Sequence, residues 1–188
     1  GNPKVHPQSE SYNGCVNPIS ERSCYVEGKR ISESLCFDFF RKYKTQIRIA
    51  RIFNTYGPRM MPKDGRVISN FISQAINGDP LYIYGSGKQT RSFCYVEDLI
   101  IGLNKIMNSD YTLPINLGSQ EELSIIDLAN LIRKKINKKL KIVHTKESNG
   151  DPMNRKPDIE LAKRVINWES KTKINDGLDI TIKEFLKN

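Results

Sequence analysis

The sequence lacks any apolar run close to the roughly 20 residues that a membrane-spanning helix needs. It also opens without a charged segment followed by an apolar one, so it shows no secretory leader. We therefore expect a cytoplasmic protein with no membrane partner. Its 38% hydrophobic and 27% charged residues are typical of a folded globular domain, which argues against a disordered chain.

Cysteine and histidine are too few and too scattered to suggest metal chemistry. The chain has four cysteines without CxxC spacing and two distant histidines, namely Cys15, Cys24, Cys36, Cys94, His6 and His144. Structural zinc sites bring four such ligands together at short, regular spacings. We expect reduced structural thiols and no metal site.

Clustered basic residues and glycine-rich phosphate turns are scarce as well. The net charge of +9 could attract nucleic acid, but the densest basic run, at 133–141, follows a helical apolar pattern and is typical of a solvated helix end. Scattered arginines would serve a small phosphate-bearing substrate equally well, and we expect no nucleic-acid partner. No GxGxxG or GxxGxxG follows a predicted strand, so the turn that cradles a dinucleotide pyrophosphate is missing from these 188 residues.

Strand and helix patterns alternate along the chain, which predicts an α/β fold. Strands are predicted at 47–53, 81–84, 115–117 and 140–143. Helices are predicted at 18–43, 67–77, 96–107, 124–136, 159–166 and 177–186, with Asp158 and Asp176 before the last two. Asn17 is the expected N-cap of the first helix, Ser124 caps the fourth, and Gly78 closes the second. The intervening segments, including 54–66 and 147–157, are expected to be loops.

Tyr25 and Lys29 are four residues apart in the first predicted helix, so the phenol and the ammonium share one face. A nearby cation favours the phenolate, which makes Tyr25 a candidate general base for a hydroxyl group. Gly28 lies between them and costs about 1 kcal/mol of helix propensity, which is tolerable where a ligand approaches closely. The alternative is an ordinary pair on a helix surface.

Several polar side chains follow predicted strands, where ligands bind in doubly wound sheets. Asn54 follows the strand at 47–53 and can offer its amide to a phosphate or sugar oxygen. Arg66 stands at the head of a predicted helix, where the guanidinium and the helix N-terminus could meet one anion. Arg91 and Arg155 are further candidates, because a guanidinium group can donate two parallel hydrogen bonds to a phosphate or a carboxylate. Ordinary surface arginine is the alternative for all three.

The blocks CYVEGKR, RIARIFNTYGPRM, DGRVISNFI, GSGKQTRSFCYVEDL, INLGS and DPMNRKPDI resemble, in order and spacing, the extended short-chain dehydrogenases of the NAD-dependent epimerase/dehydratase group. The opening segment and the last block most resemble the UDP-glucuronate decarboxylases. This resemblance implies an α/β fold with an incomplete Rossmann-like parallel sheet and a small α/β substrate-binding subdomain. Residues 1–66 would be the remnant of the NAD-binding domain, and 67–188 mainly the nucleotide-sugar-binding part, with some segments returning to the sheet.

The resemblance also implies a reaction: NAD-dependent decarboxylation of UDP-glucuronate to UDP-xylose through a 4-keto intermediate. Tyr25, Lys29 and Arg155 would be catalytic, and NAD would contact Tyr25, Lys29, Thr55 and Arg59. The UDP-sugar would contact Asn54, Arg66, Val67, Tyr82, Gln89, Arg91 and Arg155. A homodimer would form through the Tyr25 helix. Because the pyrophosphate-binding segment is missing, we expect these 188 residues alone to be inactive. A related 4-epimerase or 4,6-dehydratase and a non-catalytic nucleotide-binding or interaction module remain alternatives.

Overall fold

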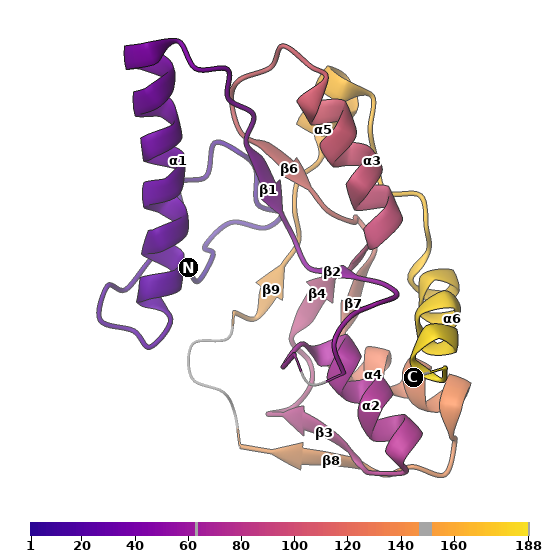
Figure 1. Cartoon of the computed structure of the whole chain (residues 1–188). Helices are drawn as coiled ribbons and strands as arrows, with labels where there is room; N and C mark the ends of the chain where they lie inside the picture. Colours follow the sequence, from indigo (N-terminus) through magenta and orange to yellow (C-terminus); the bar gives the residue numbers. More distant parts are fainter. Residues whose placement is uncertain (63, 147–151, 188) are drawn as a thin grey trace.

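The computed structural model describes residues 1–62, 64–146 and 152–187 as an α/β structure in which helices alternate with short strands (Figure 1). The helices are α1 (Ser23–Tyr43), α2 (Val67–Asn77), α3 (Val96–Met107), α4 (Ile125–Ile136), α5 (Glu160–Ile166) and α6 (Ile174–Phe185). The strands are β1 (Ala50–Ile52), β2 (Thr55–Tyr56), β3 (Leu81–Tyr84), β4 (Thr90–Ser92), β5 (Cys94–Tyr95), β6 (Ile115–Leu117), β7 (Glu122–Ser124), β8 (Ile142–Thr145) and β9 (Asn154–Arg155).

Most strand pairings are parallel, as the alternation of strand and helix predicts. β1 pairs with β6, β2 with β5 and β3 with β8, each in parallel. β4 is the centre of a three-stranded sheet, antiparallel to β7 and parallel to β9. These pairings confirm the expected α/β class with a parallel arrangement.

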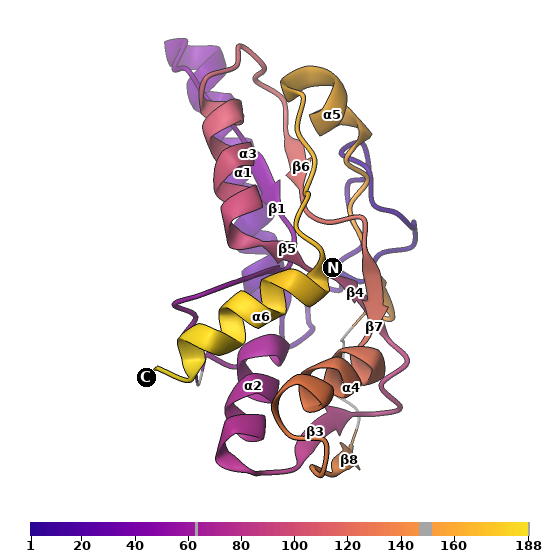
Figure 2. The ribbon, with the colours of Figure 1, turned by 90° about the vertical axis from the view of Figure 1, so that its right-hand side faces the viewer.

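One hydrophobic cluster lies where α2, α4 and α6 meet above β3, in the lower half of Figure 2. Ile72 of α2, Leu128 of α4 and Leu178 of α6 are each fully buried in it. The sequence explains this, because each helix carries apolar residues at helical spacing on the face turned toward the others. The cluster fixes the end of the molecule that carries β3 and β4.

A second cluster covers the β1–β6 pair with α3 and α5. Ile115 and Leu117 of β6 are fully buried there, and the Trp168 indole donates a hydrogen bond to the Asp98 carbonyl over 2.9 Å. Gly102 of α3 allows this approach, since a β-carbon at that position would lie 2.9 Å from the Trp168 ring. The cluster thus depends on one close helix-to-tryptophan contact.

Helix α1 has no buried residue and stands at the side of the molecule, beside β1 (Figure 1). Its apolar row is exposed, with Ile31 at 55%, Leu35 at 50% and Phe39 at 54%. The Arg51 guanidinium on β1 holds the helix by donating two hydrogen bonds of 2.8 Å to the Glu33 carboxylate. Neither α1 nor any other helix in the described ranges combines the length and apolarity that crossing a bilayer requires.

Helix boundaries partly follow the predicted ones. The ends of α2 and α3 are as predicted, Gly78 ends α2 in the left-handed conformation, and Ser124 caps α4 by accepting from the Asp127 amide. The predicted start of the first helix is wrong, whereas its end at Tyr43 is as predicted. Asn17 closes a turn on the Ile19 amide instead of capping the helix, and α1 begins only at Ser23. A side chain that bonds two residues ahead favours a turn over a helix start.

The other corrections concern short or late elements. α6 begins before Asp176, and β8 starts two residues later than predicted. The short strands β2, β4, β5, β7 and β9 lie in segments predicted as loops. Two or three residues carry too little alternation to reveal a strand, and such strands form because a partner strand is present. The part of the predicted 147–157 loop at 147–151 lies outside the described residues.

Candidate functional site

Helix α1 presents Tyr25 in its first turn and Lys29 one turn later. The Lys29 Nζ lies 5.7 Å from the centroid of the Tyr25 ring, and the Tyr25 side chain is 60% exposed. A β-carbon on Gly28 would meet no described atom within 4 Å, so this face of the helix is open. The phenol and the ammonium group therefore face the same open side of α1, where a hydroxyl-bearing ligand could reach both.

The segment after β1, which includes β2, carries Asn54, Thr55 and Arg59. The Asn54 carbonyl accepts a 2.8 Å hydrogen bond from the Cys94 amide, and the Thr55 hydroxyl donates to the Phe53 carbonyl over 3.0 Å. Arg59 is exposed and has a positive φ of 65°, which marks a tight turn. β5 thereby fixes this segment at the carboxyl end of β1, the edge at which parallel sheets bind ligands.

Arg66 and Val67 stand at the start of α2, but the helix N-terminus there already has a carboxylate. Asp64 accepts a hydrogen bond of 2.9 Å from the Arg66 amide, and its other oxygen lies 3.6 Å from the Arg66 Nε. The Ser69 hydroxyl also donates to Asp64. An incoming anion at this helix end would therefore compete with Asp64 for Arg66.

Arg91 and Arg155 are direct neighbours on paired strands. The register of β4 and β9 sets Arg91 opposite Arg155, so the two side chains leave the sheet on the same face. Arg91 is 5% exposed, and its guanidinium donates to the Thr90 carbonyl at 2.6 Å and to the Met153 carbonyl at 3.2 Å. Two guanidinium groups on one face of a sheet can together bind a ligand with two anionic groups.

Tyr82 and Gln89 both precede Arg91 in sequence, on β3 and directly before β4. The Gln89 amide donates to the Tyr84 carbonyl over 3.0 Å, and Tyr82 is 43% exposed on the outer face of β3. The connecting turn needs Gly87, which has a φ of 74° and whose β-carbon would lie 3.0 Å from Ile83. This turn sets the direction of the chain after β3 and thereby the positions of Gln89 and Arg91.

The amino-terminal segment contributes residues that the sequence patterns do not single out. Gln8 is 8% exposed, its backbone pairs with Lys156 and Asp158, and its side-chain oxygen accepts from the Lys156 amide over 3.0 Å. Gln8 therefore fixes the chain directly after Arg155. A lone glutamine between prolines and serines has no periodicity, and only a buried partner reveals its role.

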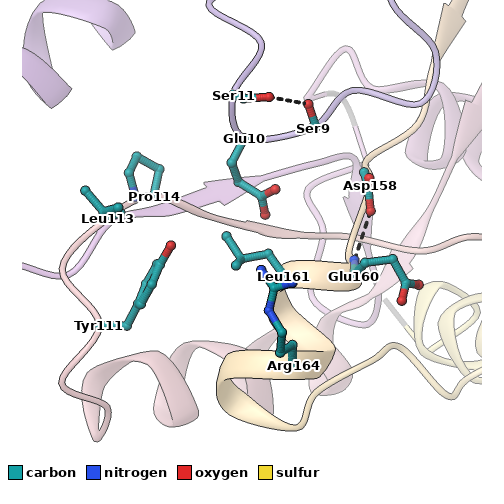
Figure 3. Close-up of a pocket in the computed structure, with 10 residues that line it drawn as sticks. All are labelled: Ser9, Glu10, Ser11, Tyr111, Leu113, Pro114, Asp158, Glu160, Leu161 and Arg164. Carbon is teal, nitrogen blue, oxygen red and sulfur yellow. Dashed lines mark hydrogen bonds between the residues drawn. The ribbon is translucent and has the colours of Figure 1, made fainter.

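A cavity of about 480 Å³ lies away from these residues, at the amino end of β6 (Figure 3). Figure 3 shows Glu10 reaching from the amino-terminal segment toward Leu161 and Arg164 of α5. None of the predicted site residues line it; its walls are Ser9, Glu10, Ser11, Tyr111, Leu113, Pro114, Asp158, Glu160, Leu161 and Arg164. Because ligands of parallel sheets bind at the carboxyl ends of strands, this cavity is not the candidate site.

The candidate site thus comes in two parts. Arg91, Arg155 and Gln89 gather around β4, whereas Tyr25 and Lys29 lie on α1. In the described parts of the chain, no hydrogen bond or ion pair joins the α1 pair to the arginines. The described residues also contain no group of three histidine, cysteine or acidic side chains arranged to hold a metal ion.

Comparison with known sequences gives a consistent likeness. Residues 2–118 match the sequence model of the NAD dependent epimerase/dehydratase family. The chain is 51% identical, over 98% of its length, to UDP-glucuronic acid decarboxylase 5 of Arabidopsis thaliana, of which it covers 54%. It is 49% identical to UDP-glucuronic acid decarboxylase 1 of Xenopus tropicalis, over 100% of this chain and 44% of that protein. The chain spans about half the length of the curated relatives it matches.

Solved structures give the same picture at lower identity. UDP-glucose 4-epimerase with UDP-glucose from Thermotoga maritima superposes with a TM-score of 0.89 at 26% identity, over 99% of this chain and 59% of that one. UDP-glucuronic acid 4-epimerase from Bacillus cereus in complex with UDP-glucuronic acid and NAD has a TM-score of 0.82 at 27% identity, over 96% and 60%. The fold is therefore shared along nearly the whole of this chain.

Proposed function

The chain belongs to the NAD dependent epimerase/dehydratase family, and we propose that its reaction is NAD-dependent decarboxylation of UDP-glucuronate to UDP-xylose through a 4-keto sugar. One observation carries this proposal: the likeness to proteins named UDP-glucuronic acid decarboxylases extends over nearly every residue of the chain. The structure supports it with a tyrosine–lysine pair and two neighbouring arginines.

Tyr25 takes the proton of the sugar C4 hydroxyl during oxidation and returns one to the same oxygen at the end. Lys29 stabilises the phenolate from one helical turn away, at the 5.7 Å distance described above. The exposure of both side chains supports this role, because a bulky sugar nucleotide must reach the phenol oxygen. Both groups act from α1, without help from the arginine pair.

Arg155 orients the substrate by its C6 carboxylate, and Arg91 binds the diphosphate. Once C4 is a ketone, the C5–C6 bond of the β-keto acid breaks and releases CO2. Its electron pair is delocalised onto the 4-keto oxygen, and C5 then takes up a proton. The neighbouring positions of the two arginines on β4 and β9 support binding of a ligand with two separate anionic groups.

When bound, NAD would supply the group that accepts a hydride from C4 of the sugar and later returns it to the same carbon. Tyr25, Lys29, Thr55 and Arg59 would hold its nicotinamide end, along α1 and at the carboxyl end of β1. Their positions suit that end of the cofactor, whereas a glycine-rich strand–turn–helix for the pyrophosphate is not among the described residues. We therefore propose that these 188 residues alone do not turn over substrate.

The remaining proposed contacts complete the UDP-sugar site from three parts of the chain. They come from the segment after β1, the start of α2 and the β3–β4 segment: Asn54, Arg66, Val67, Tyr82 and Gln89. Residues 1–66 would then belong to the cofactor side and 67–188 mainly to the sugar-nucleotide side, with some segments returning to the sheet. The four free cysteine thiols agree with a reducing compartment such as the cytoplasm.

A homodimer through the Tyr25 helix forms part of the same proposal. The exposed row on α1, from Ile31 to Tyr43, recurs at every fourth residue and gives a second helix an apolar surface to pack against. Burial of this row would order α1 and hold Tyr25 in a fixed position. Dimer formation would thus affect catalysis as well as stability.

A chimera tests the reaction directly. The matched 185 residues of the Arabidopsis thaliana UDP-glucuronic acid decarboxylase 5 are replaced by those of this chain, and products from NAD and UDP-glucuronate are separated by chromatography. We expect UDP-xylose and CO2 in equal amounts. Tyr25→Phe should lower turnover by about 10²–10⁴-fold, because it removes the proton-transferring hydroxyl. Tyr84→Phe, which changes another tyrosine that is 60% exposed but lies on β3, is the matched control and should remain active.

Other products would change the conclusion. A UDP-hexuronate epimerised at C4 would identify an epimerase, and a 4-keto-6-deoxy sugar from a UDP-hexose would identify a dehydratase. A folded chimera that binds UDP without any turnover would favour a non-catalytic nucleotide-binding module. UDP-xylose formed by the 188-residue chain alone would contradict the expected inactivity.

A further inference from the structure

The sheet β7–β4–β9 has two chemically different faces. Arg91 and Arg155 point to one face, because they are register partners on parallel strands. Thr90 and Asn154, the preceding register pair, point to the opposite face, as does Glu122, which pairs with Ser92 across β4 and β7. The polar residues on the face opposite Arg91 and Arg155 are therefore in a position to control the register between β4 and β9.

The Thr90 hydroxyl bridges all three strands. Its Oγ1 lies 2.5 Å from Glu122 Oε1 and 2.9 Å from Asn154 Oδ1. The hydroxyl has one proton to donate, which the Glu122 carboxylate attracts most strongly. An Asn154 amide rotated by 180° would donate its own N–H to the same hydroxyl, and the two bonds would then be satisfied together. Thr90 thus connects a carboxylate on β7 with an amide on β9.

Glu122 also connects this bridge to the amino-terminal segment. Its Oε2 lies 3.1 Å from His6 Nε2 and 3.9 Å from Lys156 Nζ. Lys156 is held in turn by Gln8, through both its amide and its carbonyl. The carboxylate of Glu122 therefore stands between the amino-terminal segment, β7 and the end of β9.

Strand β9 needs such support because it is only two residues long. Its described backbone link to β4 includes the 2.8 Å bond from the Thr90 amide to the Met153 carbonyl, and so short a ladder specifies its register weakly. A slip of one residue would move Arg155 to the opposite face, away from Arg91. The side-chain bridge opposes this slip, since only the present register brings Asn154 to Thr90.

We infer that Thr90 and Glu122 are positioning residues that hold β9 in register, so that Arg155 stays beside Arg91 and can select a ligand with a carboxylate. This inference rests on the proposed function, because it takes Arg155 as the group that binds the C6 carboxylate. Neither residue touches the substrate, since both lie on the opposite face of the sheet. They affect ligand binding only through the position of β9, which carries Arg155.

The test compares two ligands that differ only at C6. Titration calorimetry of the 188-residue chain measures binding of UDP-glucuronate, which has a carboxylate there, and of UDP-glucose, which has a hydroxymethyl group. Thr90→Val keeps the size of the side chain and removes the hydroxyl. We expect it to reduce the preference for UDP-glucuronate by about tenfold, the effect of losing one hydrogen bond to a charged group, with little change for UDP-glucose.

Two variants control for a general loss of stability. Thr90→Ser keeps the hydroxyl and should restore the preference to within about threefold of the unchanged chain. Thr145→Val removes a half-buried strand hydroxyl from β8, whose bond goes to the Ile83 carbonyl, and should leave the preference unchanged. An unaltered preference in Thr90→Val, or an equal loss for both ligands, would overturn the inference.

Amide hydrogen exchange without ligand separates this inference from the proposed function. Thr90→Val should speed exchange of the backbone amide at position 90, which bonds to the Met153 carbonyl in the correct register. Thr90→Ser should not speed it. If the unchanged chain binds neither ligand, the proposed UDP-sugar site is wrong, and the exchange result still decides whether Thr90 holds β9. Identical exchange in all three proteins would overturn the positioning role.

Discussion

Helix α1 and helix α4 both carry apolar residues at helical spacing but have opposite surroundings. Leu35 of α1 is 50% exposed, and α1 has no buried residue, whereas Leu128 of α4 is fully buried among α2, β3 and α6. Periodicity tells which face of a helix is apolar, but only a partner surface makes that face buried. In this chain α4 has its partners, and α1 is held through polar contacts to β1 and to the amino-terminal segment.

The same contrast divides the candidate site. The arginines sit on the paired strands β4 and β9, whereas Tyr25 and Lys29 sit on the helix without buried residues. We therefore expect ligand binding to depend on the packed part of the chain and catalysis to depend on whatever covers α1. Each prediction below tests how far this difference extends.

The largest expected difference is between two leucine truncations. Leu128→Ala should lower the free energy of unfolding by about 3 kcal/mol, because it leaves a cavity in the packed cluster. In the monomer, Leu35→Ala should change it by less than about 0.5 kcal/mol, since the side chain is already half in water. Urea titrations of both variants measure the effect. A large loss for Leu35→Ala that grows with protein concentration would show that a second copy covers α1.

The second prediction concerns the pH dependence of folding stability that arises from the buried thiol of Cys94. Burial raises the pKa of the Cys94 thiol from 9.0 to about 12, so the folded protein keeps a proton there that the unfolded chain releases above pH 9. Stability from this group is complete below pH 9 and is lost as the pH rises toward 12, by about 1.4 kcal/mol per unit. Burial also raises the pKa of Tyr56, which adds to the loss at higher pH.

Thiol labelling compares Cys94 with the cysteines of α1 without unfolding the protein. At pH 8 a thiol reagent should modify the exposed Cys24 and Cys36 of α1 quickly and reach Cys94 only in denaturant. Rapid modification of Cys94 in the folded chain would contradict its place in the β1–β6 cluster. Unfolding midpoints between pH 8 and 11 that do not fall would contradict the pKa shift.

The smallest expected effect concerns the attachment of α1. Hydrogen bonding to the Glu33 carboxylate raises the pKa of the Arg51 guanidinium, and both side chains are about 30% exposed. Glu33→Gln should therefore cost about 0.5–1 kcal/mol and speed amide exchange in α1, while α4 stays protected. The control is Glu27→Gln, which weakens the exposed pair with Arg30 at 3.4 Å and should change neither. Equal exchange in α1 and α4 would remove the contrast.

Sequence patterns predict well wherever local chemistry decides the structure. The capping of α4 by Ser124, the end of α2 at Gly78 and the bounds of α3 follow from residues within one turn of each boundary. The apolar row of α1 at every fourth residue also follows from the sequence, and it lies exposed. Burial of this row would need a partner surface, and the periodicity of a single helix does not show whether one is present.

The patterns fail where distant segments decide. β4 and β9 form because residues 64 positions apart bond to each other, and neither strand is long enough to show alternation. The Thr90, Glu122 and Asn154 cluster and the buried Gln8 were invisible for the same reason. Arg91 and Arg155 stood out as candidates because a fork of donors suits anions, but only the strand register makes them neighbours.

One titration tests the central claim that this chain carries a binding site for an anionic sugar nucleotide. UDP-glucuronate is added to the unchanged 188-residue chain in a calorimeter, in low salt and without NAD. The account predicts micromolar binding that is tighter than that of UDP-glucose. The absence of binding at millimolar UDP-glucuronate would contradict it.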